Sequence, residues 1–452
     1  MRRAQRRQIL GMLSCLAVVF GGVAVFPLWV RAQAPQANQG ATPVIPIYPT
    51  GRPRFSIAVT GFPEFRAPGG RDDLGRLAHD VLRADLNASS YFDALDPAIL
   101  PMDPRAVQIG QERALFPGLN ALKVQYLVIA TLAGRDNDLV LEGRLFEVGA
   151  GLEMIGKSYL GEPKILRAMV HRFADEIVYR VTGEKGIAST RIAYVQDVGG
   201  GAKEIFLMDY DGYNPVLITG NRSINLSPRW SPDGNRIAYT SYRNNNPDLF
   251  LLDLRSGRRT PISSTPGLNA APAWSPDGEW LALAKSAGGG TNLHLMRSDG
   301  SGQRQLTFGS SIAISASFSP DGKQIVFSSD QGGVPQIYVM DVTGSNLQRL
   351  TFRTNYNVSP RWSPRGDKIA YVSRDGGAMD IWVMDPNGNN QQRVTEGRGK
   401  NEEPAWAPGG RHLVFTSNRD GRRNIYRIGA DGSDPIRLTN NGRDNYLPDW
   451  SP

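Results

Sequence analysis

The pattern of hydrophobic and polar positions changes character along the chain. Residues 9–30 form one apolar run without a charged side chain, whereas residues 33–53 show neither a helical nor a strand period. From residue 54 the pattern becomes regular, and from residue 187 it becomes repetitive. These changes divide the chain into four predicted parts: 1–32, 33–53, 54–183 and 187–452.

The third part predicts a small α/β domain. Apolar residues recur at i, i+3 and i+4 over 74–87 and over 165–182, which is typical of amphipathic helices. Gly183 directly follows the second of these segments and suits the position after a helix end. Alternating or continuously apolar runs, typical of strands, cover 54–62, 126–132, 139–148 and 152–160.

The fourth part consists of repeats. A turn of the Trp-Ser-Pro-Asp-Gly type recurs, and its aromatic residue stands at 230, 274, 318, 362, 406 and 450, so every interval is 44 residues. Proline presets φ in such a turn, and glycine supplies its left-handed position. Each repeat has four short strand-like pieces, in the first one 228–232, 236–241, 248–253 and 260–263. Four short strands per repeat predict the blades of a β-propeller.

The two ends of the repeat region complete each other. The chain stops one strand into a sixth blade, at 447–452, and the missing strands precede the first aromatic residue, at 191–195, 204–209 and 215–219. Pairing of these segments would close the ring and leave no free sheet edge. The predicted fold class is therefore an α/β N-terminal domain followed by a closed, all-β, six-bladed propeller.

The first two parts read as an export signal and a tail. Four arginines, an apolar run and small residues ending at Ala32 follow the order of a secretory signal peptide, which we place at 1–32. An uncleaved anchor is the alternative, because the run is long enough to span a bilayer. Residues 33–53 carry five prolines and are predicted to be extended or disordered. They are either a linker or a docking tail with apolar anchors at Val44, Ile45, Ile47 and Tyr48.

Net charge and cysteine content exclude some classes of partner and of chemistry. The formal net charge of +8 first suggests an acidic partner, but residues 1–32 hold five arginines and no acid, and the remainder has a net charge of only +3. We therefore predict no nucleic-acid partner. The single cysteine, Cys15, lies in the signal, so we expect no disulfide framework and no thiol chemistry in the mature chain.

Candidate chemistry is sparse. The four histidines have no metal-ligand spacing, and no HExxH, GxSxG or Walker motif is present. The aspartates of the repeated turns have a structural role there. Asp209 and Asp211 could attract a cation, but the EF-hand spacing is absent. We predict no enzyme, no cofactor and no metal site.

The loops between blades are more variable, apart from one position. Five of the six residues that lie five positions before each aromatic are Asn; the six are Asn225, Asn269, Ala313, Asn357, Asn401 and Asn445. In one interpretation each Asn caps a turn by bonding its own backbone. In the other the amides form a ring around one mouth of the channel, where a partner would bind. Neighbouring apolar residues, such as Leu268, Ile314 and Tyr446, are expected to be exposed there.

Several motifs together resemble the TolB family of the periplasmic Tol–Pal system. They are Arg52-Pro53-x-Phe-Ser-Ile-Ala-Val, Ala84-Asp85-Leu86, the run 182–186 before 191–195, and the six repeats. The resemblance implies a non-enzymatic, monomeric periplasmic adaptor that supports outer-membrane integrity and constriction during cell division. It implies no direct membrane insertion after removal of the signal. The alternative is a peptidase-accessory or carbohydrate-binding propeller.

The resemblance also implies partners. The peptidoglycan-associated lipoprotein Pal would bind the channel face, and the inner-membrane protein TolA would bind the N-terminal segment through Val44, Ile45, Ile47 and Tyr48. Carried over by position, the residues expected to contact Pal are Asn225, Leu268, Asn269, Ala271, Ile314, Asn357, Asn401, Glu402, Asn445 and Tyr446.

Overall fold

The structure is a computed structural model that describes residues 54–66, 72–100, 103–287 and 289–452. The predicted signal and the segment 33–53, with its four apolar anchors, lie outside the described residues. Residues from Pro53 to Pro452 cluster as one compact unit. Within the described ranges, no helix is long and apolar enough to cross a membrane.

The N-terminal domain is α/β, as the sequence predicts, but its sheet has five strands rather than the four predicted, because the short β2 joins its edge. The strands lie in the order β2-β1-β3-β4-β5. β1 runs parallel to β2 and β3, and β3, β4 and β5 form an antiparallel meander. The strands are β1 (Phe55–Gly61), β2 (Phe92–Ala94), β3 (Tyr126–Arg135), β4 (Asp138–Glu147) and β5 (Leu152–Gly161). The helices are α2 (Leu74–Ala88), α3 (Glu112–Ala121) and α4 (Leu166–Thr182), and short 3-10 turns are η1 (Pro97–Ile99), η2 (Pro104–Ala106) and η3 (Pro163–Ile165).

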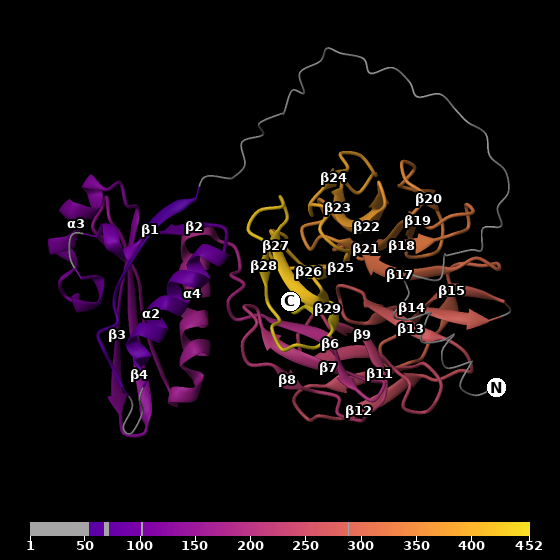
Figure 1. The fold of residues 1–452 in the computed structure, drawn as a ribbon, viewed down its shortest axis with the longest axis horizontal. Helices are drawn as coiled ribbons and strands as arrows, with labels where there is room; N and C mark the ends of the chain where they lie inside the picture. The colour runs from indigo at the N-terminus through magenta and orange to yellow at the C-terminus, as the bar shows by residue number, and fades with distance from the viewer. Residues whose placement is uncertain (1–53, 67–71, 101–102, 288) are drawn as a thin grey trace, which may run out of the picture. The chain divides into compact units, whose positions relative to one another are not determined.

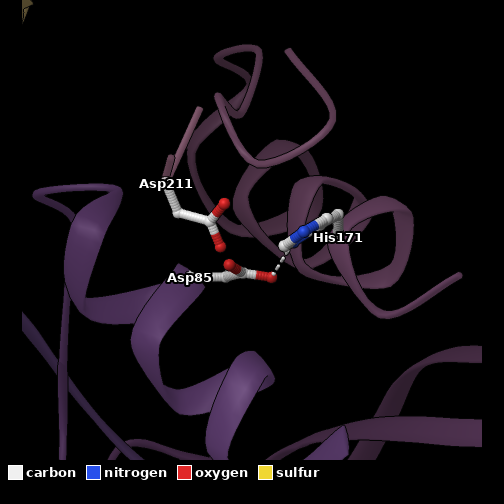
Figure 2. Close-up of side chains that lie close together, drawn as sticks. All are labelled: Asp85, His171 and Asp211. Atoms are coloured by element: carbon white, nitrogen blue, oxygen red, sulfur yellow. Dashed lines mark hydrogen bonds and ion pairs between the residues drawn. The ribbon is translucent and has the colours of Figure 1, made fainter. Parts of the chain in front are cut away.

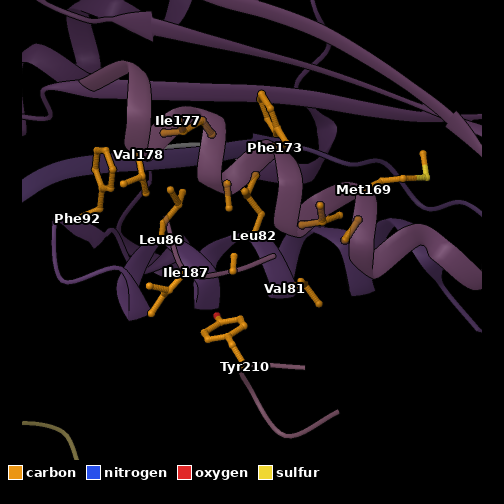
Figure 3. Close-up of a cluster of buried hydrophobic side chains, with 14 of the residues drawn as sticks. Val81, Leu82, Leu86, Phe92, Met169, Phe173, Ile177, Val178, Ile187 and Tyr210 are labelled. Atoms are coloured by element: carbon orange, nitrogen blue, oxygen red, sulfur yellow. The ribbon is translucent and has the colours of Figure 1, made fainter. Parts of the chain in front are cut away.

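Local capping residues and tertiary packing both stabilise helices α2 and α4. Asp73 caps α2 by accepting a hydrogen bond from the backbone N–H of Arg76 at 3.1 Å, and Gly183 ends α4 in the left-handed region, with φ +73°. The apolar stripes of both helices, including Leu82 and Phe173, are buried in one cluster with the sheet. Figure 3 shows part of this cluster and the ring of Tyr210, a propeller residue that belongs to it.

Helix α3 has no counterpart among the predicted elements. Pro117 lies inside it, and Gly118 follows, and both residues weaken a helix prediction. Leu115 and Leu119 are nevertheless buried, 6% and 3% exposed, in a second cluster on the sheet. Tertiary packing therefore holds a helix that local propensity disfavours.

The propeller has six blades of four antiparallel strands (Figure 1). The inner strands are β9 (Asn225–Trp230), β13 (Asn269–Trp274), β17 (Ala313–Phe318), β21 (Asn357–Trp362), β25 (Asn401–Trp406) and β29 (Asn445–Trp450). The second strands are β6 (Arg191–Gly199), β10 (Arg236–Ser241), β14 (Trp280–Ala287), β18 (Gln324–Ser329), β22 (Ile369–Asp375) and β26 (His412–Asp420). The third strands are β7 (Ala202–Asp209), β11 (Asp248–Asp253), β15 (Gly290–Arg297), β19 (Gln336–Asp341), β23 (Ala378–Met384) and β27 (Arg422–Gly429). The outer strands are β8 (Val216–Leu217), β12 (Arg259–Ser263), β16 (Arg304–Gln305), β20 (Gln348–Arg349), β24 (Gln392–Arg393) and β28 (Ile436–Arg437).

The ring closes as predicted, with the last strand completing the first sheet of the propeller. β29 pairs antiparallel with β6, with Asn445 opposite Gln196 and Trp450 opposite Ile192. Each inner strand also contacts the inner strands of the two neighbouring blades, and β29 contacts both β25 and β9. The inner strands therefore surround a central channel without a gap. Their N-terminal ends face the loops between blades, and their C-terminal ends lead into the Ser-Pro-Asp-Gly turns.

Candidate partner-binding face

The five repeated asparagines begin the inner strands, and all of them are buried. Asn225, Asn269, Asn401 and Asn445 are 0% exposed, and Asn357 is 2% exposed. Each amide has hydrogen-bond partners within the protein. The amides therefore do not form an exposed ring around the channel mouth. That a partner contacts these loops stays a prediction.

Asn401 illustrates what the asparagines do. Its amide nitrogen donates to Oδ1 of Asp380, in the third strand of the preceding blade, at 2.8 Å. The same carboxylate oxygen accepts a hydrogen bond from Oγ1 of Thr395 at 2.7 Å, and Thr395 in turn accepts from the backbone N–H of Ile381 at 3.0 Å. One buried polar group thus joins an inner strand to the neighbouring blade.

The same arrangement recurs elsewhere with different residues in the central position. Asn357 donates to Gln336 at 2.9 Å, and Asn225 donates to Glu204 at 2.9 Å. Buried polar groups must be hydrogen-bonded, and a fully satisfied network fixes one geometry. This supports a structural role in which Asn225, Asn357 and Asn401 link blades. Asn445 instead donates to Asn441 and Arg443 of its own loop, as a turn cap does.

The other predicted contact residues are also largely covered. Tyr446, Ala271, Ile314 and Glu402 are 2%, 6%, 8% and 9% exposed, and only Leu268 is partly exposed. The expectation that Ile314 and Tyr446 are exposed apolar groups is wrong, because both side chains are buried. Binding at these positions would have to use their backbone, their edges or their neighbours.

A bulge in every inner strand shapes the same face. The residue three positions before each aromatic has a positive φ between 51° and 59°; the six are Ser227, Ala271, Ser315, Ser359, Glu403 and Leu447. The pairing register shifts at this point in every blade. A bulge bends a strand and redirects a side chain. Ser315, Ser359 and Glu403 are partly exposed here. None of these residues is Gly or Asn, so residue type gave no signal; comparing the repeats in phase would have singled out the position.

Charged side chains lie at the channel mouth that faces the loops between blades, near β25 and β29. Glu403 accepts hydrogen bonds from Oγ1 of Thr416 at 2.8 Å and from the backbone N–H of Leu447 at 2.7 Å. Burial raises the pKa of Glu403 in spite of these bonds. Burial, assisted by the neighbouring Glu403, raises the pKa of Glu402 to about 6. The ammonium of Lys203 lies 4.7 Å from the ring centroid of Tyr446. Acid groups of β25, the Tyr446 ring of β29 and the ammonium of Lys203 in β7 therefore lie in neighbouring blades on this face.

Two exposed phenylalanines were not anticipated. Phe308 and Phe352 are 75% and 71% exposed and lie in successive loops between an outer strand and the next inner strand. They occupy equivalent positions, 44 residues apart. Both rings keep apolar surface accessible, and the guanidinium of Arg349 lies 4.8 Å from the centroid of the Phe352 ring.

A cluster of titratable groups joins the two domains. Asp85 of α2, His171 of α4 and Asp211 of the loop after β7 place ligand-type atoms within 4.8 Å of one another (Figure 2). Each carboxylate already has protein donors: Asp85 accepts from His171 Nδ1 at 2.8 Å and from the Tyr210 hydroxyl at 2.6 Å, and Asp211 is paired with Arg167. The pKa of His171 is raised by the adjacent Asp85 carboxylate, although burial opposes this. Because the guanidinium of Arg167 already holds a positive charge at Asp211, the arrangement fits an ionic clamp between domains better than a cation site.

All four histidines have structural partners. His79, His171, His294 and His412 are at most 9% exposed. The ring nitrogens of His79 and His294 lie within hydrogen-bond distance of backbone carbonyl oxygens, and Nε2 of His412 lies 2.8 Å from Oγ of Ser90. Burial lowers the pKa of His412 to about 3, so this side chain is neutral at ordinary pH.

The fold and this face define a class of protein: a closed six-bladed propeller that carries an α/β domain and presents its varied loops at one channel mouth. Residues 178–381 and 372–452 match the family model described as the TolB beta propeller domain, and residues 43–154 match the TolB amino-terminal domain. The chain belongs to the TolB family.

Relatives and solved structures agree with this assignment. The Tol-Pal system protein TolB of Desulfosudis oleivorans is 36% identical over 199 residues, which are 43% of this chain and 44% of that protein. The TolB of Anaeromyxobacter dehalogenans (strain 2CP-C) is 37% identical over 209 residues, 46% of this chain and 48% of that protein. The matched segments thus span less than half the length of these curated relatives. The crystal structure of TolB from Acinetobacter baumannii is 27% identical, with a TM-score of 0.76, and the match covers 89% of this chain and 98% of that one.

Proposed function

We propose that this chain is a non-enzymatic periplasmic adaptor of the Tol–Pal system. Its propeller binds the lipoprotein Pal at the inter-blade loop face, and its N-terminal segment binds TolA. Through these contacts it supports outer-membrane integrity and constriction at division. The observation that carries the proposal is membership of the TolB family, with matches in both the amino-terminal and the propeller domain.

Features of the inter-blade face support binding of a protein there. Phe308 and Phe352 are exposed apolar anchors, and Ser315 and Ser359, at the bulges of the following inner strands, are partly exposed. Aromatic anchors surrounded by polar groups are typical of the energetically dominant part of an interface. Asn357 holds the loop that presents Phe352 by donating to Gln336 and to the backbone oxygen of Thr354.

Other features favour an adaptor over an enzyme or a carbohydrate-binding propeller. The described histidines are buried and hydrogen-bonded, which leaves them poorly placed for proton transfer to a substrate. The aromatic residues of the repeated turns are between 5% and 8% exposed. Carbohydrate-binding propellers would need accessible aromatic platforms, and these rings are used to pack blades instead.

Binding of purified Pal to the mature chain, measured by titration calorimetry, tests the proposal. Leu268→Glu and Phe352→Asp should each weaken binding by about 30-fold or more, as expected for loss of an anchor worth about 2 kcal/mol. Ser315→Glu is a third probe. Glutamate is tolerated by the backbone there, because Glu403 occupies the equivalent bulge in another blade.

Controls separate loss of contact from loss of fold. Glu279→Lys changes an exposed charge in a turn at the opposite face and should bind Pal as the unmodified chain does. For TolA, deletion of residues 33–53 should abolish binding while leaving the affinity for Pal within a few-fold. Absence of any Pal binding by the unmodified chain would exclude the proposed adaptor role.

A further inference from the structure

The channel ends, on the face of the Ser-Pro-Asp-Gly turns, in a cavity of about 390 Å³. Every blade contributes its turn aromatic, a proline and the residue just before the aromatic. These preceding residues differ from blade to blade: they are Arg229, Ala273, Ser317, Arg361, Ala405 and Asp449. A rigid apolar rim therefore surrounds a channel wall whose charge is not symmetric.

One of the two arginines has a carboxylate partner. A guanidinium nitrogen of Arg229 lies 3.6 Å from Asp449 of the preceding blade, and Asp449 also accepts a hydrogen bond from the backbone N–H of Trp230 at 2.8 Å. Nε of Arg229 is buried and has no hydrogen-bond partner among the described residues. This pair joins the blade that β29 completes to the blade of β9, and a structural role accounts for most of its contacts.

Arg361 occupies the equivalent position in the blade across the channel, but its surroundings differ. The preceding blade holds Ser317 where Arg229 has Asp449, and Oγ of Ser317 accepts from the backbone N–H of Trp362 at 3.0 Å, just as Asp449 does from Trp230. Arg361 donates only to the backbone oxygens of Ala316 and Pro360, at 3.3 and 3.5 Å. Among the ion pairs of the described residues, it has no carboxylate partner.

We propose that this cavity is an oxyanion-binding site in which Arg361 binds the carboxylate or phosphate group of a small ligand or a chain terminus. Arg361 presents donors that its backbone partners do not use up, since a guanidinium offers five N–H groups. Guanidinium binds carboxylate and phosphate with charge-assisted, often bidentate, hydrogen bonds. Arg229, across the channel, is neutralised by Asp449, so Arg361 carries the unpaired positive charge of the cavity wall. Ala273, Ser317 and Ala405 are small and leave the space open.

The size of the cavity sets the class of ligand. A volume of about 390 Å³ lies near the lower end of small-molecule sites, which run from about 300 to 1,000 Å³. The site therefore suits a compact anion or the last residues of a peptide. It lies at the opposite end of the channel from the proposed Pal-binding loops and is independent of that proposal.

The experiment titrates the full mature chain, at low salt, with inorganic phosphate, with succinate, and with a short peptide bearing either a free carboxylate or an amide at its C-terminus. Tryptophan fluorescence reports occupancy directly, because Trp230 and Trp362 line the cavity. We expect saturable binding of at least one oxyanion. Binding of phosphate or succinate identifies a free small anion, whereas binding of only the carboxylate peptide identifies a chain terminus.

Two variants test the role of Arg361. Arg361→Gln should weaken binding by about 10- to 100-fold, the range expected for a hydrogen bond to a charged group. Ser317→Asp should do the same while retaining the fold, because it gives Arg361 the carboxylate partner that Arg229 already has. Arg255→Gln removes an equal charge from an exposed position and should have no effect. No saturable binding, equal affinity in Arg361→Gln, or equal weakening by Arg255→Gln would overturn the proposal.

Discussion

Removal of residues 446–452 should unfold the whole propeller rather than loosen one blade. The deletion takes away Tyr446, Leu447 and Trp450, which are 2%, 6% and 5% exposed. Full burial of a large apolar side chain contributes about 1.5–3 kcal/mol, so these three account for roughly 5–9 kcal/mol. A domain has only about 5–15 kcal/mol of net stability, so the loss is comparable with the total.

The loss extends beyond apolar burial. Asp449 leaves with the strand, so the guanidinium of Arg229 keeps its buried position without its carboxylate, which is costly. Strand β6 also loses one of its two partners, β29, and becomes an open edge next to the channel. Both effects act in the same direction as the lost packing.

Thermal unfolding followed by far-ultraviolet circular dichroism measures the outcome. Deletion of residues 446–452 should abolish the cooperative transition or lower its Tm by tens of degrees, because each kcal/mol corresponds to a few degrees for a domain of this size. Deletion of Pro452 alone, which is exposed, should leave the Tm nearly unchanged. A cooperative transition at the original Tm in the longer deletion would refute the closure argument.

Three further changes test the polar contacts. Asn401→Ala should lower the free energy of unfolding by about 1–3 kcal/mol in urea titrations, because Asp380 loses a buried donor at 2.8 Å. A decrease of less than about 0.5 kcal/mol would contradict the blade-linking role. Tyr210→Phe should cost a similar amount by removing the 2.6 Å hydrogen bond to Asp85, and unchanged stability would mean that the domain clamp contributes little. Burial holds the pKa of His412 at about 3 in the folded chain, against about 6.5 in the unfolded chain. As the pH falls, the unfolded chain therefore binds the proton first. The free energy of unfolding should decrease by up to about 1.4 kcal/mol per pH unit below pH 6.5. His412→Gln should reduce this slope between pH 6 and 4, and equal slopes would exclude the assignment.

The architecture of the propeller could be predicted because its signal is repeated six times. A spacing of 44 residues fixes the blade, and the turn chemistry fixes where its first two strands meet. The inner strand was placed at 228–232, but β9 runs over Asn225–Trp230. In the sequence Pro228 indicates the start of a strand. In the structure it follows the bulge at Ser227 and lies within β9.

The candidate site was harder to predict, because the residue type does not reveal burial. An Asn in a loop is compatible with a turn cap, a binding group or a buried link between blades, and only the third-strand partners, such as Asp380 for Asn401, distinguish these roles. Phe308 and Phe352 are exposed, although apolar residues in an alternating pattern are expected to be buried. Tertiary neighbours decide both cases, and a single chain read along its length does not show them.

Positions that differ from blade to blade indicate binding residues more reliably than positions that are the same in every blade, which indicate structural residues. A side chain that is the same in nearly every blade, as Asn is at the start of the inner strands, serves the fold: Asn357 and Asn401 join neighbouring sheets, and Asn445 holds its own loop. A ligand without six-fold symmetry can be oriented only by positions that differ around the ring. Those positions are the bulge, where Ser, Ala, Glu and Leu alternate, and the residue before the aromatic, where Arg361 faces a wall of mostly small side chains. The bulge lies toward the loops between blades, and the residue before the aromatic lines the cavity at the turns, so the proposed protein contact and the proposed anion site use different residues.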